Sequence, residues 1–272
     1  MTRRGVLALT TGSLALYLFL AWAFADDLFT AKFWDGHAIA DSSLWTYVTI
    51  AAIVIAGALK YRTAPDVAPE VTPQVPEEGQ IEDPRLWKLL LGNVHFAIFW
   101  LPIRLFVGRD WIAAGEHKLR DDAWMDGGAA LKGFWIGKTT VPDGQSAAPS
   151  GTYGWFQDFL TYMLNNEWYT WFAKVIAIGE FLVGVGLVVG ALVGIAAFFG
   201  TMMNFNFMLA GTTSSNPVLF GLGVFLVLGW KTAGWLGIDR VLLPILRTPW
   251  GRFEARKIKV NLAPPIQKPA LQ

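Results

Sequence analysis

Two ionisable side chains lie deep inside apolar runs of the sequence. Glu180 stands in WFAKVIAIGEFLVGVGLVVG, and Arg104 stands in AIFWLPIRLFVG. A charged group at membrane depth costs about 2.5–3.5 kcal/mol to insert, so such groups usually face a partner or a cavity. Glu180 could exchange protons, pair with Arg104 to fix two helices, or open to a water-filled crevice. Arg104 has a fork of donors that suits a carbonyl or an oxyanion, although the ion pair with Glu180 is its simpler use.

Two asparagines lie close together in another apolar run, GTMMNFNFMLAG. Asn204 and Asn206 are about 200° apart on an α-helix, so they cannot both face the same neighbour. Each amide could bond a neighbouring helix, satisfy the backbone at a local helix break, or face a cavity and donate to a bound ligand. We expect one of the two to point at Glu180 or Arg104.

A third group of polar residues lies at the end of the run that contains Arg104. His117 and Lys118, next to Glu116, stand at the predicted outer mouth of that helix. They could bind an anion or pass protons, or they could be ordinary interfacial charges. Trp155, Trp168 and Trp171 raise a similar choice, because they are either membrane-interface anchors or the lining of a lipid-facing entrance.

The composition excludes several kinds of redox centre. The chain has no cysteine, which rules out disulfides, thiolate metal sites, Fe–S clusters and covalently attached c-type haem. Of its three histidines, His37 and His117 fall near the ends of predicted spans or in loops, so a haem with two histidine ligands is not expected. We predict no metal site, and a diffusible carrier would have to bring any electrons that the protein handles.

The elements that hold these residues are predicted to be membrane-spanning helices. Hydrophobic residues make up 54% of the chain and charged residues only 16%, against about a quarter in soluble domains. Apolar runs cover residues 5–25 and 44–59, and we interpret them as the first two membrane spans. The first run also resembles a secretory signal, and we favour a retained span. These two helices form a unit over residues 1–62, and a proline-rich acidic linker over 63–84 follows.

The main body, residues 85–250, is predicted to be a four-helix membrane bundle. Residues 85–119 are too long for one upright helix, so we expect an interfacial first turn or two and a span near 95–115 that Pro102 kinks. Residues 116–168 should form an outer loop of short amphipathic helices. Residues 168–211 must be two spans with a tight turn near 190–194, and the last span covers 218–237.

The distribution of basic residues predicts the orientation. Arg3, Arg4, Lys60 and Arg62 flank the first two spans, and a basic tail covers 251–272. The positive-inside rule puts these segments in the cytoplasm. The fold class expected is therefore an all-α integral membrane protein with six spans and both ends inside, in the cytoplasmic membrane of a prokaryote. The tail should contact lipid headgroups, and no nucleic acid is expected as a partner.

Four passages of the main body resemble the DoxX family of membrane proteins, and within it the DoxD-like proteins. IRLFVGRDWIAAGEHKL is similar to the first core helix of that family, and WFAKVIAIGEFLVGVGLVVG to its second. The third and fourth helices of the family resemble AAFFGTMMNFNFMLAGTTSSNPVLF and WKTAGWLGIDRVLLP. The resemblance covers residues 85–250, and the first two spans depart from the minimal four-helix pattern.

The resemblance implies a four-helix bundle attached to a respiratory or redox complex. Some members of the family pass electrons from a sulfur compound such as thiosulfate to quinone, together with other membrane or extracytoplasmic subunits. On that reading Glu180 and Arg104 are catalytic, and Arg104, Glu180, Asn204 and Asn206 surround the quinone. The alternative is a non-catalytic accessory subunit that docks a larger membrane complex. A small transporter is disfavoured because the chain has no internal repeat.

Overall fold

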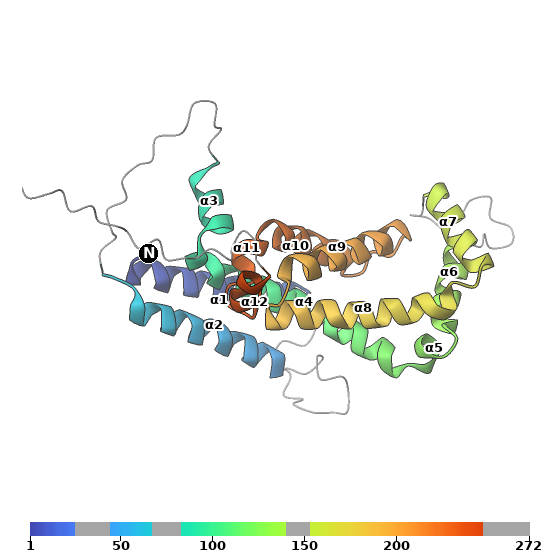
Figure 1. Ribbon diagram of the computed structural model, residues 1–272, viewed down its shortest axis with the longest axis horizontal. Helices are drawn as coiled ribbons and strands as arrows, with labels where there is room; N and C mark the ends of the chain where they lie inside the picture. Colours follow the sequence, from blue (N-terminus) through green and yellow to red (C-terminus); the bar gives the residue numbers. More distant parts are fainter. Residues whose placement is uncertain (25–43, 67–82, 140–152, 247–272) are drawn as a thin grey trace, which may run out of the picture.

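The described residues of the computed structural model are 1–24, 44–66, 83–139 and 153–246, and they form helices without a strand (Figure 1). Three of these helices are long and apolar enough to cross a membrane: α1 (Arg3–Phe24), α2 (Leu44–Thr63) and α8 (Tyr169–Val189). The described part of the chain is therefore that of an all-helical membrane protein. Most of the predicted linker and the whole basic tail lie outside the described residues.

A bent pair of helices opens the main body and gives a fourth candidate span. The short α3 (Arg85–Gly92) meets η2 (Val94–Phe96) and α4 (Ala97–Arg120) at an angle of 74°. The bend lies at Asn93, which has an extended backbone and whose side chain accepts a hydrogen bond from the His95 N–H at 2.9 Å. The predicted separate first turns are confirmed. Helix α4 continues through Pro102, so the large bend lies at Asn93 and not at the proline.

The turn expected within residues 168–211 is also confirmed. Helix α8 ends at Gly190, whose φ of +70° suits a residue without a Cβ, and α9 (Val193–Leu209) begins after Leu192. Helices α9 and α10 (Asn216–Leu228) have 17 and 13 residues, or about 26 and 20 Å at 1.5 Å per residue. Both are shorter than a hydrocarbon core of about 30 Å, so six spans and their orientation stay a prediction.

The segment between α4 and α8 forms the short helices that its pattern predicts. They are α5 (Asp122–Met125), α6 (Ala129–Thr139) and α7 (Gly154–Asn165), which gather around the start of α8 at one end of the molecule (Figure 1). Leu131 and Trp135 of α6 and Phe156 and Leu160 of α7 pack in one apolar cluster with Ala173 of α8. This cluster ties the outer segment to the bundle.

Helix α4 is the central element, because different helices pack on its two halves (Figure 1). Tyr17 and Ala21 of α1 and Ile53 of α2 share a cluster with Ile98, Leu101 and Leu105 from its first half. Helix α8 runs antiparallel to α4 and covers its second half. After α10, the chain closes with the short α11 (Trp230–Ala233) and α12 (Asp239–Ile245), which lie near the α8–α9 turn.

Glycines let α4 and α8 approach at backbone distance. A Cβ on Gly115 would lie 2.4 Å from the backbone nitrogen of Phe181, and one on Gly184 would lie 2.5 Å from that of Ile112. A Cβ on Gly108 would lie 2.9 Å from the Val188 side chain and 3.1 Å from the Gly184 carbonyl oxygen. A side chain at Gly115 or Gly184 would push the two helices apart, so the register between them depends on glycine.

Replacing Gly115 with leucine should therefore destabilise the bundle strongly. Overpacking typically costs 1–3 kcal/mol, and a clash with backbone should cost about 3 kcal/mol or more. Thermal unfolding of the detergent-purified protein would measure the loss. Gly133→Leu on α6 is the matched control, because nothing lies within 4 Å of a Cβ built there. Equal melting temperatures for the two variants would contradict the close α4–α8 packing.

Candidate functional site

Arg104 is buried and bonds to backbone carbonyls. Its side chain is 2% exposed, and its Nη1 and Nη2 donate to the carbonyl oxygens of Ala233 at 2.8 Å and Leu236 at 2.9 Å. A Cβ on Gly190 would lie 2.4 Å from Nη1, so the guanidinium lies directly under the α8–α9 turn. Arg104 thus joins α4 to that turn and to the segment after α11.

Asp239 holds the same turn from the other side. Its Oδ1 accepts a hydrogen bond from the Leu192 N–H at 2.6 Å, and its Oδ2 accepts one from the Val193 N–H at 2.9 Å. The first N–H groups of a helix lack partners within that helix, so this carboxylate caps α9 from a distant part of the chain. Burial raises the pKa of the Asp239 carboxyl above its usual value, although the hydrogen bonds from the Val193 and Leu192 N–H groups and the charge of nearby Arg104 partly oppose this rise.

Backbone bonds complete the contact between α12 and the turn. The Asp239 N–H donates to the Gly190 carbonyl at 2.8 Å, and the Ile238 N–H donates to the Val189 carbonyl at 3.1 Å. Arg104, Asp239 and the turn therefore form one closely packed unit, which we call the turn clasp. Arg104 and Asp239 both bond to backbone groups in this unit, so Arg104 has a structural role here.

Glu180 pairs with Lys118 and not with Arg104. The Lys118 Nζ donates to Glu180 Oε2 at 2.7 Å, and the Glu180 side chain is 1% exposed. The suggested ion pair between Glu180 and Arg104 is wrong, because the two residues lie at different levels of α8. Arg104 lies beside Gly190, and Glu180 is ten residues before that glycine, or about 15 Å along the helix. Lys118 is partly exposed and also lies over the Trp124 ring, 5.1 Å from its centre.

Asn204 is buried within the bundle without a hydrogen-bond partner. It is 1% exposed, and neither its Nδ2 nor its Oδ1 has a partner among the described residues. A Cβ on Gly200, one turn earlier on the same face of α9, would lie 3.0 Å from both Trp111 and Val183. Asn204 therefore faces the interior between α4 and α8, but it bonds neither Glu180 nor Arg104.

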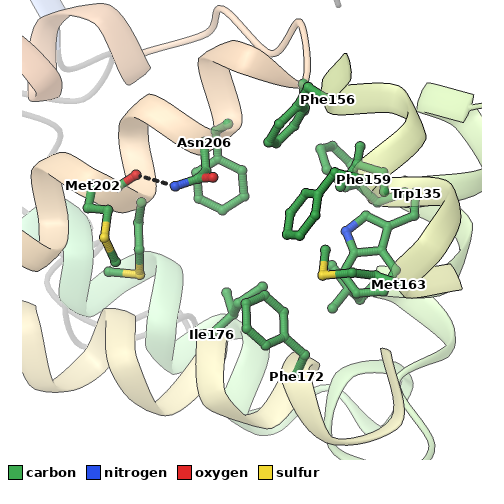
Figure 2. Close-up of a pocket in the computed structure, with 14 residues that line it drawn as sticks. Trp135, Phe156, Phe159, Met163, Phe172, Ile176, Met202 and Asn206 are labelled. Carbon is green, nitrogen blue, oxygen red and sulfur yellow. Dashed lines mark hydrogen bonds between the residues drawn. The ribbon is translucent and has the colours of Figure 1, made fainter. Parts of the chain in front are cut away.

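Asn206 faces a separate, aromatic pocket. Its Nδ2 donates to the Met202 carbonyl of its own helix at 2.8 Å, and Figure 2 shows its oxygen on the opposite side, toward the pocket. The pocket has a volume of about 170 Å³ and lies where α6 and α7 meet α8 and α9. Aromatic side chains supply much of its lining: Phe134, Trp135, Phe156, Phe159, Phe172 and Phe207. We call it the ring pocket.

Two exposed tryptophans stand next to phenylalanines that line the ring pocket. The Trp155 ring meets Phe156 edge-on at 5.5 Å, and the Trp171 ring meets Phe172 at 5.3 Å. Trp155 is 62% exposed and Trp171 is 49% exposed. Trp155 and Trp171 border the pocket without lining it, so both the membrane-interface anchor and the lipid-facing entrance stay predictions. Trp135, which the sequence pattern does not single out, is the tryptophan that lines the pocket itself.

The remaining candidates lie apart from these features. His117 is exposed. Adjacent residues of an α-helix are about 100° apart, so the His117 side chain projects in a different direction from that of Lys118. Lys118 itself contacts the buried Glu180, so it is the member of that predicted pair that reaches the interior. Among the described residues, the predicted site residues therefore fall in separate places: the turn clasp, the Glu180–Lys118 pair, the bundle interior at Asn204 and the ring pocket at Asn206.

Asp239 has no signal in the sequence that sets it apart. It follows the glycine-containing stretch AGWLGI and precedes an arginine, as a surface acid would. Only the return of the chain to the α8–α9 turn makes it a cap. The ring pocket is equally hidden in the sequence, because only the packing of four successive helices, α6 to α9, brings its lining residues together.

Comparison with protein-family models, with curated proteins and with solved structures found no match for this chain. The DoxX resemblance therefore stays a prediction.

Replacing Asp239 with alanine should loosen the α8–α9 turn. Loss of a helix cap costs up to about 2 kcal/mol, and here two N–H groups lose their acceptor. Asp239→Asn keeps one acceptor oxygen and should lie between the wild type and the alanine variant. Thermal unfolding and amide hydrogen exchange at the start of α9 would measure the change. Asp158→Ala, an exposed acid on α7, is the control; unchanged exchange in Asp239→Ala would contradict the cap.

Replacing Asn204 with leucine should stabilise the protein. A buried polar group without a hydrogen bond costs about 1–3 kcal/mol, and leucine of similar size removes that cost. Thermal unfolding should shift upward by several degrees, whereas Asn206→Leu, at an exposed amide, should shift it little. A lower melting temperature for Asn204→Leu would mean that the amide has a bound partner in the folded protein.

Proposed function

We propose that this chain is the membrane subunit of a redox complex of the DoxX type, and that it binds a quinone in the ring pocket. The observation that carries the proposal is the pocket itself, with its aromatic lining and the Asn206 amide (Figure 2). Its volume of about 170 Å³ is close to the roughly 150 Å³ of an engineered apolar cavity that binds one benzene ring.

An amide suits both redox forms of a quinone. Its NH₂ group can donate to a quinone carbonyl, and its oxygen can accept from a quinol hydroxyl. One Asn206 N–H is used by the Met202 carbonyl, which leaves a second N–H and the oxygen for a ligand. The surrounding phenylalanines supply ring faces and edges for stacking.

Electrons would reach the quinone from a partner subunit. The chain has no cysteine to hold an Fe–S cluster, so the proposal needs an external donor. The partner would oxidise a sulfur compound such as thiosulfate on the extracytoplasmic side, as the resemblance implies. In this proposal the protein lies in the cytoplasmic membrane of a prokaryote with both ends inside. Glu180 and Lys118 are the titratable pair from which protons could reach the bundle interior.

A second function is favoured by a different observation. Arg104 bonds backbone carbonyls and Glu180 bonds Lys118, so the two residues expected to be catalytic are used in holding helices together. This favours a non-catalytic accessory subunit that docks a larger complex. The exposed aromatic side chains of α7, Trp155, Phe159 and Tyr162, would then belong to the docking surface or to the membrane interface.

Asn206→Leu should weaken quinone binding without harming the fold. Loss of one hydrogen bond of about 1.4 kcal/mol lowers affinity about tenfold. The measurement is binding of a radiolabelled benzoquinone to the gently purified protein, with mass spectrometry of co-purified lipids and subunits. Asn166→Leu is a matched control, because Asn166 makes the same bond to the carbonyl four residues earlier on the surface of α7.

The outcomes separate the two functions. A tenfold loss in Asn206→Leu and none in Asn166→Leu would support the quinone site. A wild-type protein that co-purifies with partner subunits, yet neither contains nor binds quinone, would leave the accessory function. Substitutions of Arg104 or Glu180 are poorer tests, because both residues join helices and their loss affects assembly.

A further inference from the structure

An apolar groove continues from the ring pocket along α8 and α9. It has a volume of about 670 Å³ and shares four lining residues with the pocket: Phe172, Ile176, Met202 and Met203. From Phe172 it extends to Val189, Ala191 and Leu192 at the α8–α9 turn. That distance is 17 residues of α8, or about 26 Å. The groove therefore begins at the ring pocket and follows nearly the whole of α8.

Glycine makes room for this groove. Gly179 and Gly186 belong to its lining, and exposed side chains such as Val175, Leu182 and Phe199 lie along it. A Cβ on Gly179 would approach only the Met203 sulfur, at 3.9 Å. Helix packing therefore does not require glycine at this position, in contrast to Gly115 and Gly184, and a larger side chain there would occupy the groove.

The lining chemistry selects the kind of occupant. All lining residues of the groove are apolar, whereas the ring pocket at its end has aromatic side chains and an amide. A site with these two connected parts matches a molecule with a polar-substituted ring and a long hydrocarbon chain. A helix of a partner protein, about 10 Å across, could cover the groove but could not enter a cavity the size of one ring.

We propose that the groove holds the hydrocarbon tail of the same lipid whose ring lies in the ring pocket, so that the ligand is a long-tailed quinone. This inference rests on the proposed function and adds the ligand class to it. The ring would lie beside Asn206, and the tail would run along Gly179 and Gly186 toward the turn clasp. Burial of the tail, not the ring alone, would then supply much of the affinity.

The test compares two probes on the full-length protein in nanodiscs. One is dimethoxy-methyl-benzoquinone without a tail, and the other is the same ring with an isoprenoid tail long enough to reach the α8–α9 turn. The wild type should bind the tailed probe at least about tenfold more tightly. Gly179→Leu should remove most of that preference and leave the affinity for the tail-less probe unchanged. Gly179→Ala should have an intermediate effect, which guards against a folding defect in the larger variant.

Gly221→Leu on α10 is the matched control, because nothing lies within 4 Å of a Cβ at Gly221 and it is not part of the groove. It should bind both probes as the wild type does. A photoreactive group at the end of the tail should label residues of the turn, near Val189 and Leu192, and this labelling should fall in Gly179→Leu.

Three results would overturn the inference, and they are distinguishable. Equal wild-type affinity for the two probes would remove the tail from the groove and leave the quinone function standing. Binding of neither probe would remove the proposed function as well. Loss of a co-purifying subunit in Gly179→Leu, with the preference for the tailed probe intact, would assign the groove to a partner helix.

Discussion

The antiparallel register between α4 and α8 determines where every candidate residue lies. It is set by backbone contact at Gly108, Gly115 and Gly184, where a single Cβ would meet main-chain atoms. Once those glycines are opposite their partners, Arg104 falls beside the α8–α9 turn and Glu180 falls beside Lys118. The two charges that share apolar surroundings in the sequence are thereby placed at different depths of the bundle, and each finds its own partner.

This separation explains why the interior holds its charges without an evident catalytic cluster. An arginine in an apolar environment needs acceptors for its N–H groups, and backbone carbonyls left free at helix ends are suitable ones. Two of the Arg104 nitrogens donate to the Ala233 and Leu236 carbonyls after α11, while Asp239 accepts from the free N–H groups that start α9. The end of α8 is bonded by the backbone N–H groups of Ile238 and Asp239, so distant segments of the chain hold both sides of the α8–α9 turn.

Periodicity and length predict the helices well, but they carry little information about side-chain partners. The tight turn at Gly190, the separate first turns before α4 and the helices of the outer segment all follow from local signals such as glycine, chain length and amphipathic spacing. The Glu180–Lys118 pair depends on how far α8 slides along α4, which no local signal encodes. The environments of Asn204 and Asn206 also depend on tertiary packing, because the orientation of α9 turns one amide into the bundle and the other to the ring pocket.

The two asparagines of α9 differ in how well the folded protein satisfies them. Asn206 keeps one N–H bonded to its own backbone, so it can lie in an apolar pocket without a ligand at moderate cost. Asn204 has no such bond and is fully buried, which makes it the less stable arrangement. If α9 rotated to give Asn204 a partner, Asn206 would leave the ring pocket, since the two residues are about 200° apart. The rotation of α9 that keeps Asn206 at the ring pocket therefore leaves Asn204 without a hydrogen-bond partner. If the proposed quinone site is correct, the unpartnered amide of Asn204 is the cost of keeping Asn206 at the ring pocket.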